Sequence, residues 1–195
     1  MEFARGSHRL ALVPLALAVP ATLLLLPAGV ALAVLGLAVL WFHRDPQRSP
    51  PPEGVLSPAD GRVSVVRVED DRLRVGVFMN VTDVHVNRAP VTGTVRDVTH
   101  TPGAHRPAFS KDSDRNERVR IDLGEYEVVL IAGWFARRIT PYVAAGDDLE
   151  RGQRVGHVSF GSRADVVFPP DVDREDLAVA EGDRVRAGET VLARP

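Results

Sequence analysis

The sequence predicts a mainly β domain preceded by an N-terminal, hydrophobic, helical membrane anchor. Three observations support this class. Residues 10–42 contain no charged side chain, and a proline-rich segment follows them. The remainder consists of short runs rich in β-branched residues, separated by Gly, Asp, Asn and Pro, a pattern typical of short strands joined by turns. With 195 residues, the chain has room for one domain of ordinary size beside the anchor.

The anchor is expected to span residues 1–43. About 20 apolar residues cross the hydrocarbon core of a bilayer, so the run is too long for one upright helix and short for two. Pro14, Pro20 and Pro27 interrupt it, and residues 27–29 (Pro-Ala-Gly) predict a turn. Arginines on both flanks favour a hairpin that enters and leaves on the cytoplasmic side, and a single tilted span is the alternative. We therefore expect a protein of the cell membrane whose second domain lies on the cytoplasmic face.

A linker at residues 44–54 contains four prolines and is expected to be stiff and extended. The β domain is expected over residues 55–195. Its strand candidates all combine β-branched residues with flanking turn residues, and they are 55–69, 72–81, 93–100, 117–124, 126–136 and 165–169.

Composition excludes several classes of chemistry. The chain has no cysteine, which excludes disulfides, thiolate nucleophiles, cysteine-ligated zinc and iron–sulfur clusters. The 24 basic and 26 acidic residues give a net charge of -2, so no nucleic-acid partner is indicated. Lys111 is the only lysine, and it is therefore the only candidate for any mechanism that needs one.

One internal repeat is visible. Residues 143–155 (VAAGDDLERGQRV) align with residues 179–191 (VAEGDRVRAGETV), and the shared glycines and aspartates predict two similar hairpin turns. The pair also resembles the duplicated hybrid motif of the barrel-sandwich fold, as found in biotinyl and lipoyl domains. Those carriers display a lysine between the two halves, whereas the intervening segment 159–169 (SFGSRADVVFP) has none.

Five motifs occur together and in a fixed order. They are SPADG (57–61), DVHVNRAP (83–90), KDSDRNER (111–118), AGWFARRI (132–139) and FGSRADVVFP (160–169). Each alone is weakly specific, but together they resemble the short form of the phosphatidylserine decarboxylase proenzymes. These are pyruvoyl-dependent lyases of phospholipid biosynthesis. The resemblance covers nearly the whole chain, from the anchor to about residue 193.

The resemblance implies a proenzyme that cleaves itself between Gly161 and Ser162, into a β chain (1–161) and an α chain (162–195). Ser162 would become a covalent pyruvoyl cofactor. The implied reaction converts phosphatidylserine, or archaetidylserine, to the corresponding ethanolamine lipid. The residues permit this reading, because decarboxylation of an amino acid needs an electron sink. Pyridoxal phosphate is the usual sink, but no phosphate-binding motif accompanies Lys111.

The same resemblance assigns two further catalytic residues. Asp60 in SPADG matches the family aspartate, and His85 in DVHVNRAP matches a family histidine. A histidine with a pKa of about 6.5 suits proton transfer at neutral pH. Longer members carry a second histidine three residues later, where this chain has Arg88, so the base that drives self-cleavage stays open.

Substrate contacts are assigned to arginines, because a guanidinium suits lipid phosphate. The candidates are Arg88, Arg137 and Arg138, with a surface ion pair as the alternative for the last two.

No metal is expected, since the HxH pair of barrel-sandwich zinc peptidases is absent: Asn87 takes the second position. The expected partners are the phospholipid, the membrane and the two chains of one precursor, with homo-oligomerisation left open. Two alternatives remain at this point, a membrane-anchored non-enzymatic barrel-sandwich binding module and a metallopeptidase.

Overall fold

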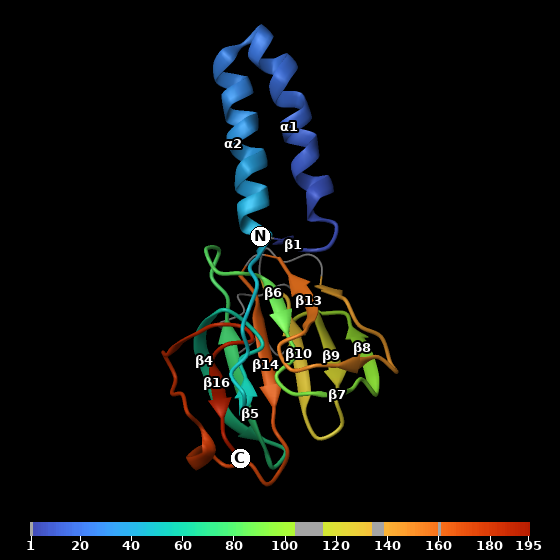
Figure 1. Ribbon diagram of the computed structural model, residues 1–195, viewed down its shortest axis with the longest axis vertical. Helices are drawn as coiled ribbons and strands as arrows, with labels where there is room; N and C mark the ends of the chain where they lie inside the picture. Colours follow the sequence, from blue (N-terminus) through green and yellow to red (C-terminus); the bar gives the residue numbers. More distant parts are fainter. Residues whose placement is uncertain (1, 104–114, 134–138, 160) are drawn as a thin grey trace. The chain divides into compact units, whose positions relative to one another are not determined.

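The computed structural model describes residues 2–103, 115–133, 139–159 and 161–195. The chain forms two compact units, Met1–Gln47 and Arg48–Pro195 (Figure 1). Residues 48–54 of the predicted linker belong to the second unit. Arg151 holds them there by donating to the carbonyl oxygens of Pro51 and of Gly54, the latter at 2.8 Å.

The first unit is a pair of packed helices, α1 (Ser7–Leu24) and α2 (Leu26–Phe42). Two short strands at its ends, β1 (Glu2–Phe3) and β2 (Arg44–Asp45), pair antiparallel. The helices approach closely at glycines, because a Cβ at Gly29 would collide with Thr22 and one at Gly36 would collide with Leu15. Small residues at such points let two apolar helices pack backbone against backbone.

The break between the helices lies at Leu25, which is extended with φ -153° and ψ 98°. The turn predicted at residues 27–29 is therefore wrong. Those residues form the first turn of α2, where proline is tolerated because the N–H that it lacks has no intrahelical partner there. Pro14 and Pro20 lie inside α1 without ending it.

An N-terminal apolar helix that could anchor the protein in a membrane is present, as predicted. By length and composition α1 can cross a bilayer, and α2 is more apolar but only 17 residues long. The outer faces of both helices carry exposed leucines and valines, and Leu23 and Leu24 are more than four-fifths exposed. A helix that is apolar all round is typical of a membrane span or of a protein core.

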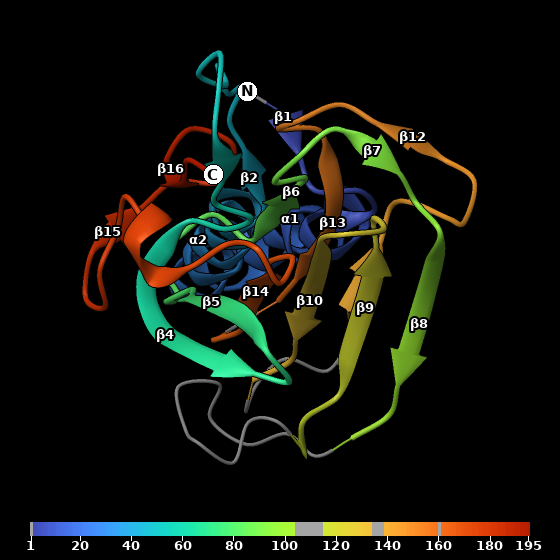
Figure 2. The same ribbon diagram turned by 90° about the horizontal axis from the view of Figure 1, so that it is seen from below.

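The second unit is mainly β, as predicted, and its main element is a seven-stranded antiparallel sheet of order β15-β4-β5-β14-β10-β9-β8. Figure 2 shows β10, β9 and β8 side by side at one edge of this sheet. The strands are β15 (Arg184–Val185), β4 (Gly61–Glu69), β5 (Arg72–Phe78), β14 (Arg163–Val167), β10 (Glu127–Ile131), β9 (Arg118–Asp122) and β8 (Asp97–Thr101).

Three smaller sheets complete this unit. The first has the order β11-β13-β6, and the others pair β12 with β7 and β16 with β3. Their bounds are β11 (Ile139–Pro141), β13 (Arg154–Val158), β6 (Val86–Arg88), β12 (Asp148–Leu149), β7 (Gly93–Thr94), β16 (Val191–Ala193) and β3 (Val55–Leu56). A short 3-10 helix lies at Arg174–Asp176.

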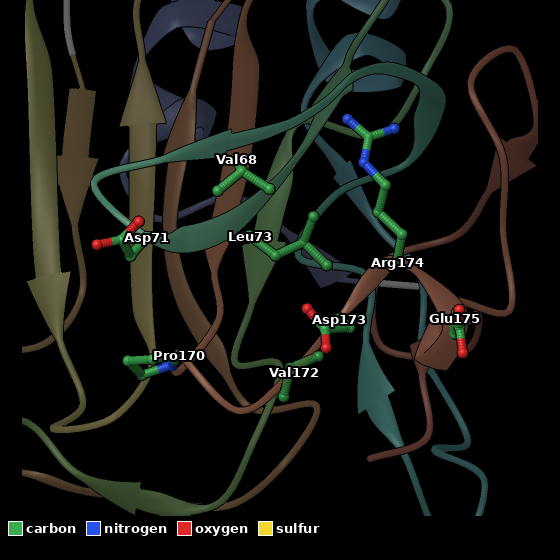
Figure 3. Close-up of a pocket in the computed structure, with 8 residues that line it drawn as sticks. All are labelled: Val68, Asp71, Leu73, Pro170, Val172, Asp173, Arg174 and Glu175. Carbon is green, nitrogen blue, oxygen red and sulfur yellow. The ribbon is translucent and has the colours of Figure 1, made fainter.

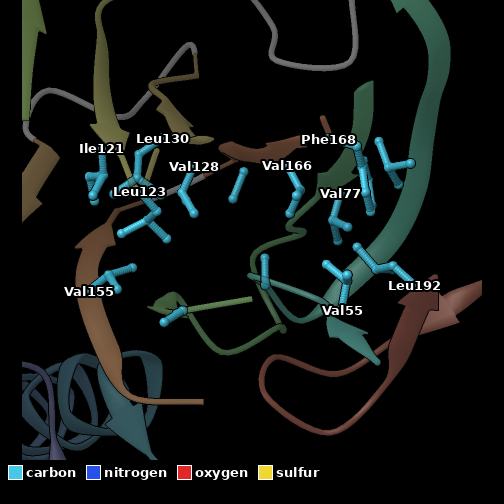
Figure 4. Packing of buried hydrophobic residues seen from close by; sticks show 14 of the residues in the cluster. Val55, Val77, Ile121, Leu123, Val128, Leu130, Val155, Val166, Phe168 and Leu192 are labelled. Atoms are coloured by element: carbon cyan, nitrogen blue, oxygen red, sulfur yellow. The ribbon is translucent and has the colours of Figure 1, made fainter. Parts of the chain in front are cut away.

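One apolar core fills the space between the large sheet and the smaller ones (Figure 4). Alternate residues of β14 face it, and Val166 and the following Phe168 are fully buried there. The opposite face of β14 is buried too, since Val167 packs with Val129 and Ile131. A strand buried on both faces is fixed in position, which matters because β14 starts at the segment that the sequence singles out.

The internal repeat forms two equivalent loops, as predicted. Gly146 and Gly182 have φ near +95°, and each donates its N–H to a backbone carbonyl, that of Val95 and that of Val63 respectively. In each loop an aspartate side chain accepts from the backbone N–H three residues earlier, at 2.8–2.9 Å. The duplication is therefore structural. Its placement in the barrel-sandwich class stays a prediction.

Candidate active site

Ser162 lies where the chain passes from one sheet to another, between the end of β13 and the start of β14. Its side chain is fully buried. The hydroxyl oxygen lies 3.5 Å from the Val158 carbonyl oxygen and 3.9 Å from the Met79 sulfur, so both contacts are long. By contrast, the Ser162 carbonyl is firmly held, because it accepts the Met79 N–H at 2.8 Å.

Gly161 has φ +62°, in the left-handed region. A Cβ at this position would meet nothing within 4 Å, so the space is open and only the backbone conformation calls for glycine. The peptide bond predicted to break therefore joins a residue in an unusual conformation to a buried serine. That combination leaves the Gly161 carbonyl carbon without a side chain to shield it.

His85 lies in the segment that runs beside β13. Its backbone carbonyl accepts the Val158 N–H at 3.3 Å, and Val158 in turn accepts from Ser162, so the two predicted residues flank one strand end. The imidazole is buried, and its Nδ1 lies 3.0 Å from the Asp83 carbonyl oxygen. Because a carbonyl oxygen only accepts, Nδ1 carries the proton of the neutral ring, and Nε2 presents a lone pair. His85 as the base stays a prediction.

Asp60 lies in a different environment. Within the described part of the chain, its carboxylate bonds to Arg48 and to the Ala187 N–H rather than to His85. Arg48 Nη2 is 2.9 and 2.8 Å from the two oxygens, and Arg48 also pairs with Glu189 at 3.1 Å. The geometry joins Ser162 to the His85 segment and places Asp60 in a separate, partly buried ion cluster.

Comparison with known proteins places this chain in a family. The sequence model of phosphatidylserine decarboxylase matches residues 35–193. A Halobacterium salinarum protein named "Putative archaetidylserine decarboxylase proenzyme" is 62% identical over 98% of this chain and 99% of its own length. The phosphatidylserine decarboxylase proenzyme of Thermobifida fusca is 49% identical over 85% of this chain and 77% of its own. The chain belongs to the phosphatidylserine decarboxylase family.

Membership decides the class of function. The chain is an enzyme, a decarboxylase of phospholipid biosynthesis that is made as a proenzyme. This outcome separates it from the two alternatives that the sequence left open, a non-enzymatic binding module and a metallopeptidase. Among the described residues, no group of three His, Asp or Glu side chains is placed to hold a metal ion.

The decarboxylase differs from longer members at Arg88, and the structure shows where that side chain goes. In an extended strand neighbouring side chains point to opposite faces, so Arg88 does not share a face with Asn87. Its guanidinium donates to the Gly152 carbonyl oxygen at 3.0 Å. The aliphatic part of the side chain packs against Gly188, where a Cβ would collide with it. Arg88 as a substrate ligand stays a prediction, and Arg137 and Arg138 lie outside the described residues.

A cavity of about 330 Å³ opens elsewhere in the decarboxylase (Figure 3). Its wall includes Leu73, which pairs with the residue after the C-terminal end of β14, whereas Ser162 lies at the other end. None of the predicted site residues lines it. This cavity is therefore not the reaction site that the sequence indicates.

Sequence reasoning missed three residues at the site. Asn87 was considered only as a failed metal ligand, yet its side chain is fully buried beside Met79. Met79 itself contacts Ser162 through both backbone and sulfur. Arg48 was counted as part of the linker. Alternation along 85–88 could have indicated Asn87, because residues two apart share a face wherever the chain is extended. No local pattern indicates the other two, whose contacts span long sequence separations.

The ion cluster around Asp60 leads us to predict how the stability of the protein depends on pH. Burial raises the pKa of Asp60 above its usual 3.8, outweighing the opposing effects of Arg48 and the Ala187 N–H. The fold thus favours the protonated form, and stability from this group is lost as pH rises from 3.8 through the raised pKa. Arg48→Met should raise that pKa further. We expect it to lower the free energy of unfolding by up to about 3 kcal/mol near pH 8, and by much less in mild acid.

Thermal unfolding across this pH range measures the effect. Arg62→Met is the matched control, because Arg62 donates to a backbone carbonyl at an exposed position. A loss of stability in Arg48→Met that is the same at every pH would contradict the interpretation.

Proposed function

We propose that the chain cuts itself between Gly161 and Ser162 and decarboxylates a phospholipid with a serine headgroup, at a pyruvoyl group derived from Ser162. The observation that carries this proposal is the placement of the Gly-Ser pair. A buried serine follows a left-handed glycine at a sheet crossing, in a chain that belongs to a proenzyme family. The relatives' names offer two substrates, phosphatidylserine and archaetidylserine.

Self-cleavage is assigned to residues of this chain. Ser162 Oγ attacks the Gly161 carbonyl carbon, and the acyl group moves from nitrogen to oxygen. Elimination of the resulting ester then frees the β chain and leaves residue 162 as a dehydroalanine at the new end of the α chain, and water converts it to the ketone with release of ammonia. His85 is the proposed base, because its Nε2 carries the lone pair and its segment lies against the same strand end as Ser162. Asp60 is proposed to act from its ion cluster, by holding the SPADG segment against Ala187.

The surroundings of residue 162 fit a pyruvoyl group. The site is closed to solvent, and the Met79 N–H fixes the carbonyl of residue 162. Strand pairing on both sides of β14 holds the next residue, Arg163. When formed, the group supplies a ketone that condenses with the substrate amine and takes up the electrons left by departing CO₂. His85 is then the proposed proton donor to the carbon that loses CO₂.

The apolar helices are proposed to hold the enzyme at the membrane that contains its substrate. Their exposed leucines and valines match a hydrocarbon environment. Arginines flank both ends of the apolar stretch, which favours a cytoplasmic catalytic unit. A lipid substrate then reaches the enzyme without leaving the bilayer.

An assay of the purified full chain in detergent tests this function. Without any added cofactor, we expect it to convert a serine-headgroup lipid to the ethanolamine lipid with one CO₂ released per headgroup. Hydroxylamine, which reacts with ketones, should inactivate it, and lipids with diacyl and diether tails supplied in parallel should reveal the preferred substrate. Activity that appears only after pyridoxal phosphate is added would contradict the proposal.

A further inference from the structure

Asn87 has a buried polar atom that the fold does not satisfy. The side chain is fully buried, and its Nδ2 faces the Pro58 carbonyl oxygen at 3.3 Å and the Met79 sulfur at 3.6 Å. Since the Pro58 carbonyl can only accept, the amide orientation is fixed. The Asn87 side-chain oxygen then has no hydrogen-bond partner among the residues that the structure describes. A buried acceptor left unpaired costs about 1–3 kcal/mol, so its presence requires an explanation.

The location of this acceptor supplies one. The Met79 sulfur lies between the two polar side chains, 3.6 Å from Asn87 Nδ2 and 3.9 Å from Ser162 Oγ. Along the chain, Asn87 is two residues after His85 and lies in β6, which starts directly after that histidine. Asn87 therefore belongs to the buried group that surrounds residue 162.

We propose that the side-chain oxygen of Asn87 accepts a hydrogen bond from the amine of the lipid headgroup and so selects a primary amine. This inference rests on the proposed function, in which that amine is delivered to residue 162. An amine is a pure donor when protonated and still a donor when neutral, which makes it the chemical complement of an unpaired acceptor. Asn87 would thereby contact the substrate directly.

A neutral amide suits this task better than a carboxylate. The amine must lose a proton before it can attack a ketone, and a nearby negative charge would hold it in the protonated form. Asn87 can accept from either form, and because its amide carries no net charge it favours the protonated amine less than a carboxylate would. The choice of asparagine in place of aspartate is thus explained by the chemistry that follows binding.

Two variants and two lipids test the inference in the full chain in detergent. The probes are short-chain lipids with ethanolamine and choline headgroups, since choline has no N–H to donate. Calorimetry should show that Asn87→Leu weakens ethanolamine-lipid binding about tenfold, the size of one hydrogen bond, and leaves choline-lipid binding within about twofold. Asn87→Asp should shift the pH profile of kcat/KM to higher pH.

Ser57→Ala is the matched control. It deletes another buried hydrogen bond in the neighbouring segment, from Ser57 Oγ to the Ala59 carbonyl at 2.7 Å, and should leave the ratio of the two affinities unchanged. Equal weakening of both lipids by Asn87→Leu, or an unshifted pH profile in Asn87→Asp, would overturn the inference. So would a chain that stops cleaving itself in Asn87→Leu but not in Asn87→Asp, since that assigns the side chain to cleavage. Failure of the wild type to cleave or to release CO₂ would instead count against the proposed function.

Discussion

Ser162→Ala is expected to remain one chain of 21.2 kDa and to lose decarboxylase activity by a factor on the order of 10⁴ or more. Alanine removes only the hydroxyl oxygen, so the packing around Met79 and Val158 should survive. Without that oxygen there is neither a nucleophile for the Gly161 carbonyl nor a source for the ketone. Intact-mass analysis of the purified protein measures the first result, and CO₂ release measures the second.

Ser159→Ala is the matched control, because Ser159 lies in the same connection between β13 and β14 but outside the predicted bond. It should cleave like the wild type, and the smaller piece should have a blocked amino terminus. A wild-type protein that is fully active as one unbroken chain would refute the proposed mechanism.

Asp165→Leu is expected to lower the free energy of unfolding by roughly 3–5 kcal/mol. Asp165 is fully buried and accepts two hydrogen bonds from buried Arg163, at 2.7 and 3.0 Å, and a third from Arg74 at 3.2 Å. Removing the carboxylate takes the Asp165 charge away from a guanidinium that stays in the interior. The destabilisation should appear as a lower midpoint in thermal or denaturant unfolding.

The double variant Arg163→Met with Asp165→Leu separates charge from packing. Because it removes both charges, it should recover a large part of the lost stability. Asp148→Asn, at an exposed carboxylate that accepts from Thr94, should change stability by no more than about 0.5 kcal/mol. If the double variant were as unstable as the sum of its single variants, the ion pair would not be the cause.

Much of the fold could be predicted from local pattern. β-Branched runs gave strands such as β4 and β9, and the shared Gly and Asp of the repeat gave two loops with matching hydrogen bonds. Strands of two or three residues, such as β12 and β15, were not predicted, because so short a stretch has no alternation to detect. The helix break fell at Leu25 rather than at residues 27–29, since proline is compatible with the first turn of a helix.

The site was predictable only in part. The five motifs single out Ser162, which the structure buries between two sheets, and its catalytic role stays a prediction. The partners of Asp60 could not be predicted, because Ala187 is brought to it from the far end of the chain and Arg48 comes from what the composition marks as linker. Asn87 was overlooked because an asparagine between a histidine and an arginine has no distinctive pattern. Its meaning depends on which atoms it leaves unpaired.

The position of β14 has a consequence for the mature enzyme. This strand is hydrogen-bonded to β5 on one side and to β10 on the other, and the chain after it returns to pair with β4 and β3. Once the proposed cut is made, the small piece is therefore interlaced with the large one and cannot leave without dismantling the sheet. Denaturation would then release two separate chains from the processed enzyme, whereas the precursor unfolds as one chain. Refolding of the processed enzyme should consequently depend on protein concentration, while refolding of the Ser162→Ala precursor should not.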